Sequence, residues 1–82
     1  MKGMVLGLGG VGTVIARELA RAPQFGELLL ADVDGERALR VAEEIGLAHV
    51  RACRVDAGNR QELRAALDGV GILVNAVIPR YN

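Results

Sequence analysis

Four glycines within six residues, from Gly7 to Gly12, are the part of the sequence whose residue types and spacing point most directly to chemistry. The run reads G-x-G-x-x-G, follows an apolar segment and precedes a helical pattern, which predicts a loop that holds the pyrophosphate of a dinucleotide. The first glycine permits a tight turn, the second lets the pyrophosphate approach the backbone, and the third lets helix and strand pack closely. Unpaired amides at the start of the helix then face the phosphates. We expect the loop to bind the cofactor through Gly7, Gly9, Gly10, Val11 and Gly12.

Asp32 makes this prediction more specific. It ends an apolar segment twenty residues after Gly12, which is the spacing of the carboxylate that accepts the ribose hydroxyls of a bound dinucleotide. Asp34 is the competing acid, but its position favours a cap on the helix that follows.

The carboxylate of Asp32 also predicts NAD in preference to NADP. Each charge-assisted bond to a ribose hydroxyl contributes roughly 1.5–3 kcal/mol. A 2′-phosphate about 4 Å away would instead be repelled by about 4 kcal/mol at an effective dielectric near 20. Arg37 and Arg40 would soften this repulsion unless they form ion pairs with neighbouring glutamates on their helix, which we expect them to do.

The elements that must position these residues alternate between short apolar segments and amphipathic ones. We expect strands at residues 2–6, 27–32, 48–55 and 70–78, and helices at residues 11–20, 35–45 and 60–67. This order, with short connections, predicts an α/β Rossmann-like fold of three layers, with a parallel four-stranded sheet in the order third, second, first, fourth. The fourth strand would be an apolar edge, so residues 1–82 read as a dinucleotide-binding domain that forms the first half of a larger doubly wound domain, without a substrate domain.

Several other polar residues have two readings each. Asp56 follows the third strand and either contacts the adenine side of the cofactor or caps its own loop. Asn75 interrupts an apolar strand, and because a buried amide needs partners, we expect it to contact the cofactor or the backbone. Thr13 either donates its hydroxyl to a phosphate or is a capping or merely exposed residue. His49 lies at the opposite end of the sheet, where we expect a structural or exposed residue.

Composition excludes several classes of function. The 82 residues carry ten basic and ten acidic side chains and only two aromatic ones, which disfavours a nucleic-acid partner. Cys53 is the only cysteine, which rules out an internal disulfide and fits a reducing compartment, and we expect it to pack as a small apolar residue. No apolar run approaches the roughly 20 residues that cross a membrane, so we expect a cytoplasmic protein. No metal cluster, nucleophile and base pair, or other catalytic residue is recognisable in the sequence.

The sequence resembles the N-terminal part of the saccharopine dehydrogenase family, which includes lysine 6-dehydrogenases. The similarity lies in four blocks, residues 5–12, 30–34, 54–57 and 74–82. The last is the most specific, because Asn75-Ala76 followed by Pro79 and Tyr81-Asn82 is similar to that family's loop beside the nicotinamide. The resemblance implies that Asn75, Ala76 and Pro79 lie along the cofactor toward the nicotinamide and that Asp32 holds the adenosine ribose. The family is often described as binding NADP, and Asp32 departs from that expectation.

Two functions follow from this reading. By resemblance, the chain is the cofactor-binding portion of an oxidoreductase that passes hydride from a carbon–nitrogen bond of an amino acid or its conjugate to the nicotinamide. The alternative is a non-enzymatic nucleotide-sensing domain of the kind that regulates potassium transport, which shares the glycine run and the acid after the second strand. In either case we expect self-association through the exposed edge strand or docking to a further C-terminal domain, and no membrane partner.

Overall fold

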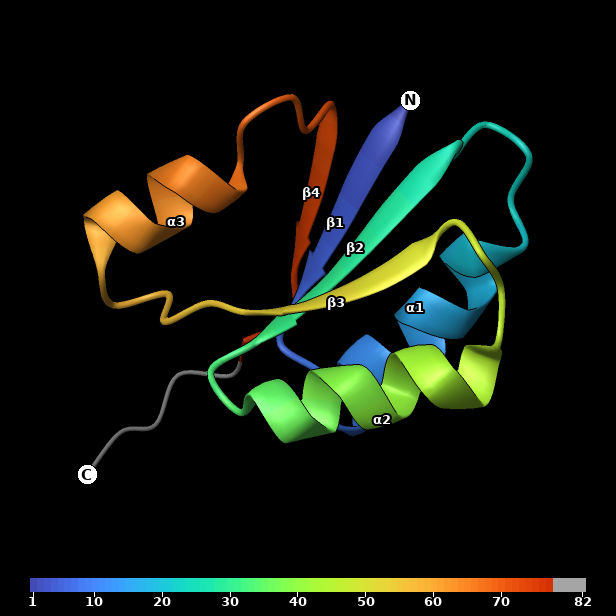
Figure 1. Ribbon diagram of the computed structural model, residues 1–82, viewed down its shortest axis with the longest axis horizontal. Helices are drawn as coiled ribbons and strands as arrows, with labels where there is room; N and C mark the ends of the chain where they lie inside the picture. The colour runs from blue at the N-terminus through green and yellow to red at the C-terminus, as the bar shows by residue number, and fades with distance from the viewer. Residues whose placement is uncertain (78–82) are drawn as a thin grey trace.

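A computed structural model describes residues 1–77 of the chain, which form an α/β fold with a single parallel sheet (Figure 1). Its elements, in chain order, are β1 (Lys2–Leu6), α1 (Gly10–Ala20), β2 (Glu27–Asp32), α2 (Gly35–Ile45), β3 (Val50–Arg54), α3 (Arg60–Ala66) and β4 (Ile72–Asn75). The predicted alternation of strands and helices is confirmed. Pro79 and the last part of the block that ends at Asn82, residues 78–82, lie outside the described residues, so what was predicted for them stays a prediction.

The strands lie in the order β3-β2-β1-β4, as predicted, and all three neighbouring pairs are parallel. Strand β1 is therefore central, with Leu6 opposite Ala31 of β2 on one side and opposite Asn75 of β4 on the other. Because the strands run in one direction, their carboxyl ends meet at one edge of the sheet. The residues that follow the strands consequently gather there.

Alternating side chains of the central strands divide the core into two layers. On one face, Val5, Leu28 and Leu30 are fully buried beneath α1 and α2. On the other face, Met4 and Leu6 pack with Ala31 beneath α3. Figure 1 shows α1 and α2 together on one side of the sheet and α3 alone on the other. The sheet is thus covered by helices on both faces, which explains why the middle residues of its inner strands, 3–6 and 28–31, carry no polar side chain.

The ends of the helices follow from local hydrogen bonds. The side chain of Asp34 accepts bonds from the amides of Glu36 and Arg37, which confirms its predicted role as the cap of α2. Gly46 ends α2 with a positive φ of 69°, also as predicted. Asn59 caps α3 in the same way as Asp34, through the amide of Glu62.

Two predicted strands are too long. Strand β3 begins at Val50 rather than at residue 48, because the amide of Val50 closes a turn onto the carbonyl of Leu47. Strand β4 covers residues 72–75 rather than 70–78, because Val70 is still bonded to the turn after α3 through the carbonyl of Leu67. The amide of Ala76 still donates to the carbonyl of Leu6 at 2.7 Å, but Ala76 and Val77 no longer belong to the strand. The apolar character of residues 70–77 does not by itself mark where the sheet ends.

The smaller differences concern helix ends. Helix α1 begins at Gly10, one residue earlier than predicted, and α3 ends at Ala66, one residue earlier than predicted. Within the described residues, no helix is long and apolar enough to cross a membrane.

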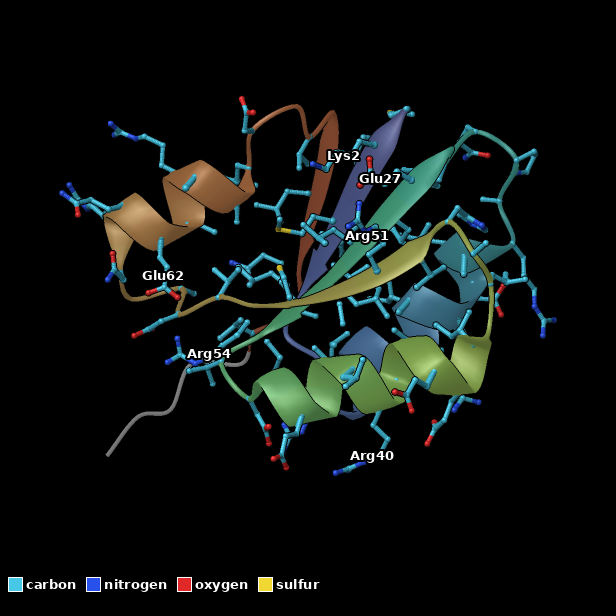
Figure 2. The ribbon with its side chains drawn as sticks, viewed as in Figure 1. Lys2, Glu27, Arg40, Arg51, Arg54 and Glu62 are labelled. Atoms are coloured by element: carbon cyan, nitrogen blue, oxygen red, sulfur yellow. The ribbon has the colours of Figure 1, made fainter. Side chains whose placement is uncertain are left out.

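The two edges of the sheet differ in character. Strand β3 exposes Arg51 and Arg54, and their guanidinium groups form ion pairs with Glu27 and Glu62 at 3.8 and 3.3 Å, as Figure 2 shows. Strand β4 instead exposes Ile72 and Leu73, with 43% and 39% of their surface accessible. The prediction of an apolar fourth strand at the edge is confirmed.

The burial of the core leads to a test of the fold. Replacing Leu30 by alanine removes a fully buried side chain and should lower the free energy of unfolding by about 2–5 kcal/mol. The same substitution at Leu39, which is 53% exposed on α2, should change it by less than about 0.5 kcal/mol. Urea denaturation followed by circular dichroism measures both, and equal effects would contradict the assignment of the core.

Candidate functional site

The carboxyl ends of the strands enclose a cleft of about 740 Å³. Residues 6–9, 55–58 and 76–77 line it, together with Asp32, Val33 and Arg37. Five residues that the sequence analysis assigned to the cofactor site are part of this lining: Gly7, Gly9, Asp32, Asp56 and Ala76. Gly10, Val11 and Gly12 form the first turn of α1 directly after the lining loop, and Asn75 ends the adjacent strand without reaching the lining.

Two glycines of the run are required by the protein's own packing. Gly7 has a φ of +94°, a conformation that other residues rarely adopt. A β-carbon at Gly7 would also lie 2.8 Å from the amide nitrogen of Val77. A β-carbon at Gly12 would overlap the carbonyl oxygen of Gly7. These two glycines therefore allow α1 to lie directly against the turn that follows β1.

Gly9 is different, because nothing in the protein explains it. Its φ of −70° and ψ of −163° suit any residue, and a β-carbon there would have no neighbour within 4 Å. Gly9 nevertheless lines the cleft, so a side chain would project into the space that a ligand needs. The open space over Gly9 fits the close approach of a pyrophosphate to the backbone.

The start of α1 has the features of an anion-binding helix end. Gly9 provides no side-chain cap, and the first turn carries no acidic residue. The amides of the first turn have no acceptor within the helix, and they lie at the helix end where the dipole is positive. Without a side-chain cap, they are available to an anion. Thr13 does not add a free donor, because its hydroxyl donates to the carbonyl of Leu8 at 3.1 Å.

Asp32 lies at the floor of the cleft with only 6% of its surface exposed. Its Oδ2 accepts a hydrogen bond from the amide of Leu8 at 2.8 Å, and its Oδ1 accepts one from the amide of Asp34 at 2.9 Å. Sequence reasoning predicted a ribose-binding carboxylate and missed both contacts with the backbone. A carboxylate has about four lone-pair sites, so two remain for hydroxyl groups of a ligand.

Asp56 and Asn75 both make local backbone contacts. Oδ1 of Asp56 accepts from the amide of Gly58 at 2.9 Å, so Asp56 caps its own loop, as one of the two alternatives predicted. Asp56 also lines the cleft. Asn75 was expected to be buried, and this is wrong: it is exposed because it stands on the edge strand, where no further strand covers it. Its Oδ1 accepts from the amide of Val77 at 3.0 Å, which is the backbone contact that we named as one alternative.

Arg37 and Arg40, the two arginines that follow Asp32 in the sequence, lie in different places. Arg37 lines the cleft, whereas Figure 2 shows the side chain of Arg40 pointing away from the molecule on α2. Neither forms the ion pair with a glutamate that we expected from their helix spacing, as far as residues 1–77 show. The position of Arg37 follows from Asp34: the cap starts α2 at the carboxyl end of β2, so the first turn of the helix stands beside the cleft.

The remaining reactive side chains are engaged elsewhere. His49 lies at the far end of the sheet, with Nε2 2.8 Å from the carbonyl of Ala20, which is a structural contact. Cys53 is partly buried against the α3 layer, and this burial raises the pKa of its thiol, an effect that the charge of Lys2 partly opposes. In the described part of the chain, no group of three or more potential metal ligands is present. This arrangement can bind and orient an extended anionic ligand.

Comparison with known proteins agrees with this geometry. A sequence model described as the saccharopine dehydrogenase NADP binding domain matches residues 4–82. The chain belongs to this family. It is a domain that binds a nicotinamide dinucleotide in dehydrogenase-like oxidoreductases, as the resemblance implied.

A curated relative and two solved structures illustrate the relationship. Carboxyaminopropylagmatine dehydrogenase from Synechocystis sp. is 31% identical over an alignment 80 residues long, and the match covers 95% of this chain and 20% of that protein. Quinate dehydrogenase from Corynebacterium glutamicum, in complex with NAD, superposes with a TM-score of 0.75 and 25% identity over 93% of this chain and 26% of its own. An uncharacterised protein from Mycobacterium Paratuberculosis has a TM-score of 0.71 and 24% identity over 98% of this chain and 32% of its own, which shows the fold alone. The chain thus spans about a fifth of the curated relative.

The contrast between two glycines gives a test of the site. Gly9→Ala should fold with a stability within about 1 kcal/mol of the wild type, because the added methyl meets nothing in the protein. It should nevertheless lose dinucleotide binding. Gly12→Ala should instead destabilise the fold by at least about 1–3 kcal/mol, because its methyl overlaps the Gly7 carbonyl. Thermal unfolding with and without NAD separates the two, and normal NAD binding by Gly9→Ala would contradict the placement of the pyrophosphate.

Proposed function

We propose that this chain is the NAD-binding portion of an oxidoreductase that acts on a carbon–nitrogen bond of an amino acid or its conjugate. The observation that carries the proposal is the pairing, in one cleft, of the open space over Gly9 with the carboxylate of Asp32. The pyrophosphate would lie over Gly9 and the first turn of α1, and the adenosine ribose would lie on Asp32. The nicotinamide end would extend past Ala76 and Asn75. The bound cofactor supplies hydride transfer, and the residues of this chain hold and orient it.

The preference for NAD rests on the balance between Asp32 and Arg37. Asp32 is buried at the floor of the cleft, where its negative charge is poorly screened and opposes a 2′-phosphate. Arg37 is exposed at the cleft and would attract the same phosphate, but through solvent that weakens the attraction. The buried carboxylate therefore supports the proposed preference for NAD, although the family is described by its NADP binding.

The reaction class rests on family membership and on the curated relative, whose name makes it a dehydrogenase of carboxyaminopropylagmatine. Because the chain covers about a fifth of that relative, we infer that residues 1–82 are one part of a longer enzyme with a separate substrate-binding domain. The single free cysteine and the absence of a disulfide fit our proposal of a cytoplasmic protein. No feature of the cleft favours the regulatory alternative over the oxidoreductase.

The exposed edge is the second basis for a longer protein. Apolar residues of β4 are accessible, and their backbone has no neighbour on one side within the described residues. In the complete enzyme, we propose that a further strand or domain covers this edge. Residues 1–82 alone would instead associate with a second copy of themselves.

Binding of NAD tests the proposed function. A ligand that binds only the folded protein at 100 times its Kd stabilises it by about 2.7 kcal/mol, so NAD should raise the melting temperature. Asp32→Ala should lower NAD affinity about 10- to 100-fold, because it removes charge-assisted bonds to the ribose. No thermal shift at millimolar NAD would refute the proposal.

Comparison of NAD with NADP tests the cofactor preference. Wild-type protein should bind NAD more tightly than NADP in isothermal titration. Arg37→Ala should weaken NADP binding about two- to fivefold and leave NAD binding unchanged, because it removes an exposed, solvent-screened cation at the cleft. Arg40→Ala removes the same charge outside the cleft and serves as the control. Tighter binding of NADP than of NAD would overturn the preference.

Association of the chain tests the role of the edge strand. Sedimentation velocity of the wild type should show dimers or larger species at high protein concentration. Leu73→Lys places a charge on the exposed edge and should shift the chain to the monomer. Leu39→Lys, which changes an exposed leucine on α2, should leave the association unchanged. A wild type that stays monomeric at all concentrations would exclude association through β4.

A further inference from the structure

The carboxylate of Asp32 joins two segments that are far apart in the sequence. Its Oδ2 is bonded to the amide of Leu8 inside the glycine loop, and its Oδ1 to the amide of Asp34 in the turn before α2. The bond to Leu8 is buried and spans 24 positions. Each oxygen therefore holds a different loop of the cleft in place.

The bond to Leu8 fixes the glycine loop at its middle. The side chain of Leu8 is 2% exposed and packs in the α1 and α2 layer of the core, so its amide cannot turn toward water without moving this side chain. At the start of the loop, the amide of Gly7 is bonded to the carbonyl of Ala31 at 2.8 Å. Beyond Leu8, the carbonyl of Gly9 accepts the amide of Thr13 in α1, but no bond from the exposed Gly9 amide is present among the described residues. The loop is thus attached to β2 through Gly7 and Leu8, and the Gly9 amide is open to the cleft.

We propose that Asp32 is a positioning residue that holds the glycine loop in its ligand-binding conformation before any cofactor arrives. This role is additional to the contact with ribose, and its consequence for binding rests on the proposed function. A carboxylate suits it because both oxygens are acceptors and both partners are amide donors. Asparagine has one acceptor and one donor group in the same place, so its NH₂ would face either the Leu8 or the Asp34 amide.

Hydrogen exchange of single amides, measured by NMR on the 82-residue chain without ligand, tests the contact itself. In the wild type, the Leu8 amide should exchange much more slowly than the Gly9 amide. In Asp32→Asn the Leu8 amide should exchange at least about tenfold faster, because asparagine either turns its NH₂ toward Leu8 or replaces the charge-assisted bond to Leu8 by a weaker neutral one. Asp34→Asn is the matched control: it removes the same charge two residues away, keeps an acceptor for the cap of α2, and should leave Leu8 protected.

A pair of nucleotides separates the two roles of Asp32. ADP carries both ribose hydroxyls, whereas 2′,3′-dideoxy-ADP keeps the diphosphate and lacks them. If Asp32 also positions the loop, Asp32→Asn should weaken binding of the dideoxy nucleotide by about tenfold or more relative to wild type and to Asp34→Asn. If Asp32 only reads the hydroxyls, the substitution would weaken ADP alone, and this would overturn the proposal.

The proposed function and the positioning role fail in different ways. A wild type that binds neither nucleotide would refute the proposed function, and the exchange of the Leu8 amide would still decide whether Asp32 holds the loop. If Asp32→Asn does not fold, the comparison of Leu8 with Gly9 in the wild type decides. Equal, fast exchange of these two amides would overturn the proposal.

Discussion

The contact between α1 and the turn after β1 is the constraint on which the site depends. Gly12 lies so close to the carbonyl of Gly7 that no side chain fits between them, and Gly7 itself needs a positive φ. Because of this contact, the N-terminal end of α1 lies at the edge of the sheet where β1 and β2 end. Because Ala76 lies against the same point, with its β-carbon 3.3 Å from one built at Gly12, β4 also ends at the cleft. The glycines thus determine where three elements meet.

Most of the fold could be predicted from the sequence because its signals are local and strong. Strand β2 matches its predicted range because Gly26 and the helix cap Asp34 bound it closely, and α2 has a cap at each end. Strand β4 was predicted too long because hydrophobicity continues where pairing stops. Pairing depends on β1, which offers partners only from Gly3 to Leu6, and this information is not local.

The site could be predicted in part for the same reason. Gly9 and Asp32 were assigned to the cleft from a spacing that many dinucleotide-binding folds share, and the structure brings both into one lining. The bonds from the amides of Leu8 and Asp34 were not foreseen, because a motif specifies residue types and not the backbone donors around them. Arg37 was assigned to an ion pair from helix spacing. Its place at the cleft depends instead on the direction in which α2 leaves β2.

The strand order has a consequence for how the protein forms during synthesis. Strand β1 is synthesised before the other strands of the sheet, yet it is central, and its partners β2 and β4 begin 25 and 70 residues later in the chain. Such contacts between distant parts of a chain form slowly. One edge of β1 has no partner strand until residues 72–75 have been made. Ala76, which lines the cleft, comes directly after them. A nascent chain therefore completes the described lining of its cleft only after Ala76 and Val77 have been made, and until then the apolar residues of β1 depend on β2 and the helices for cover.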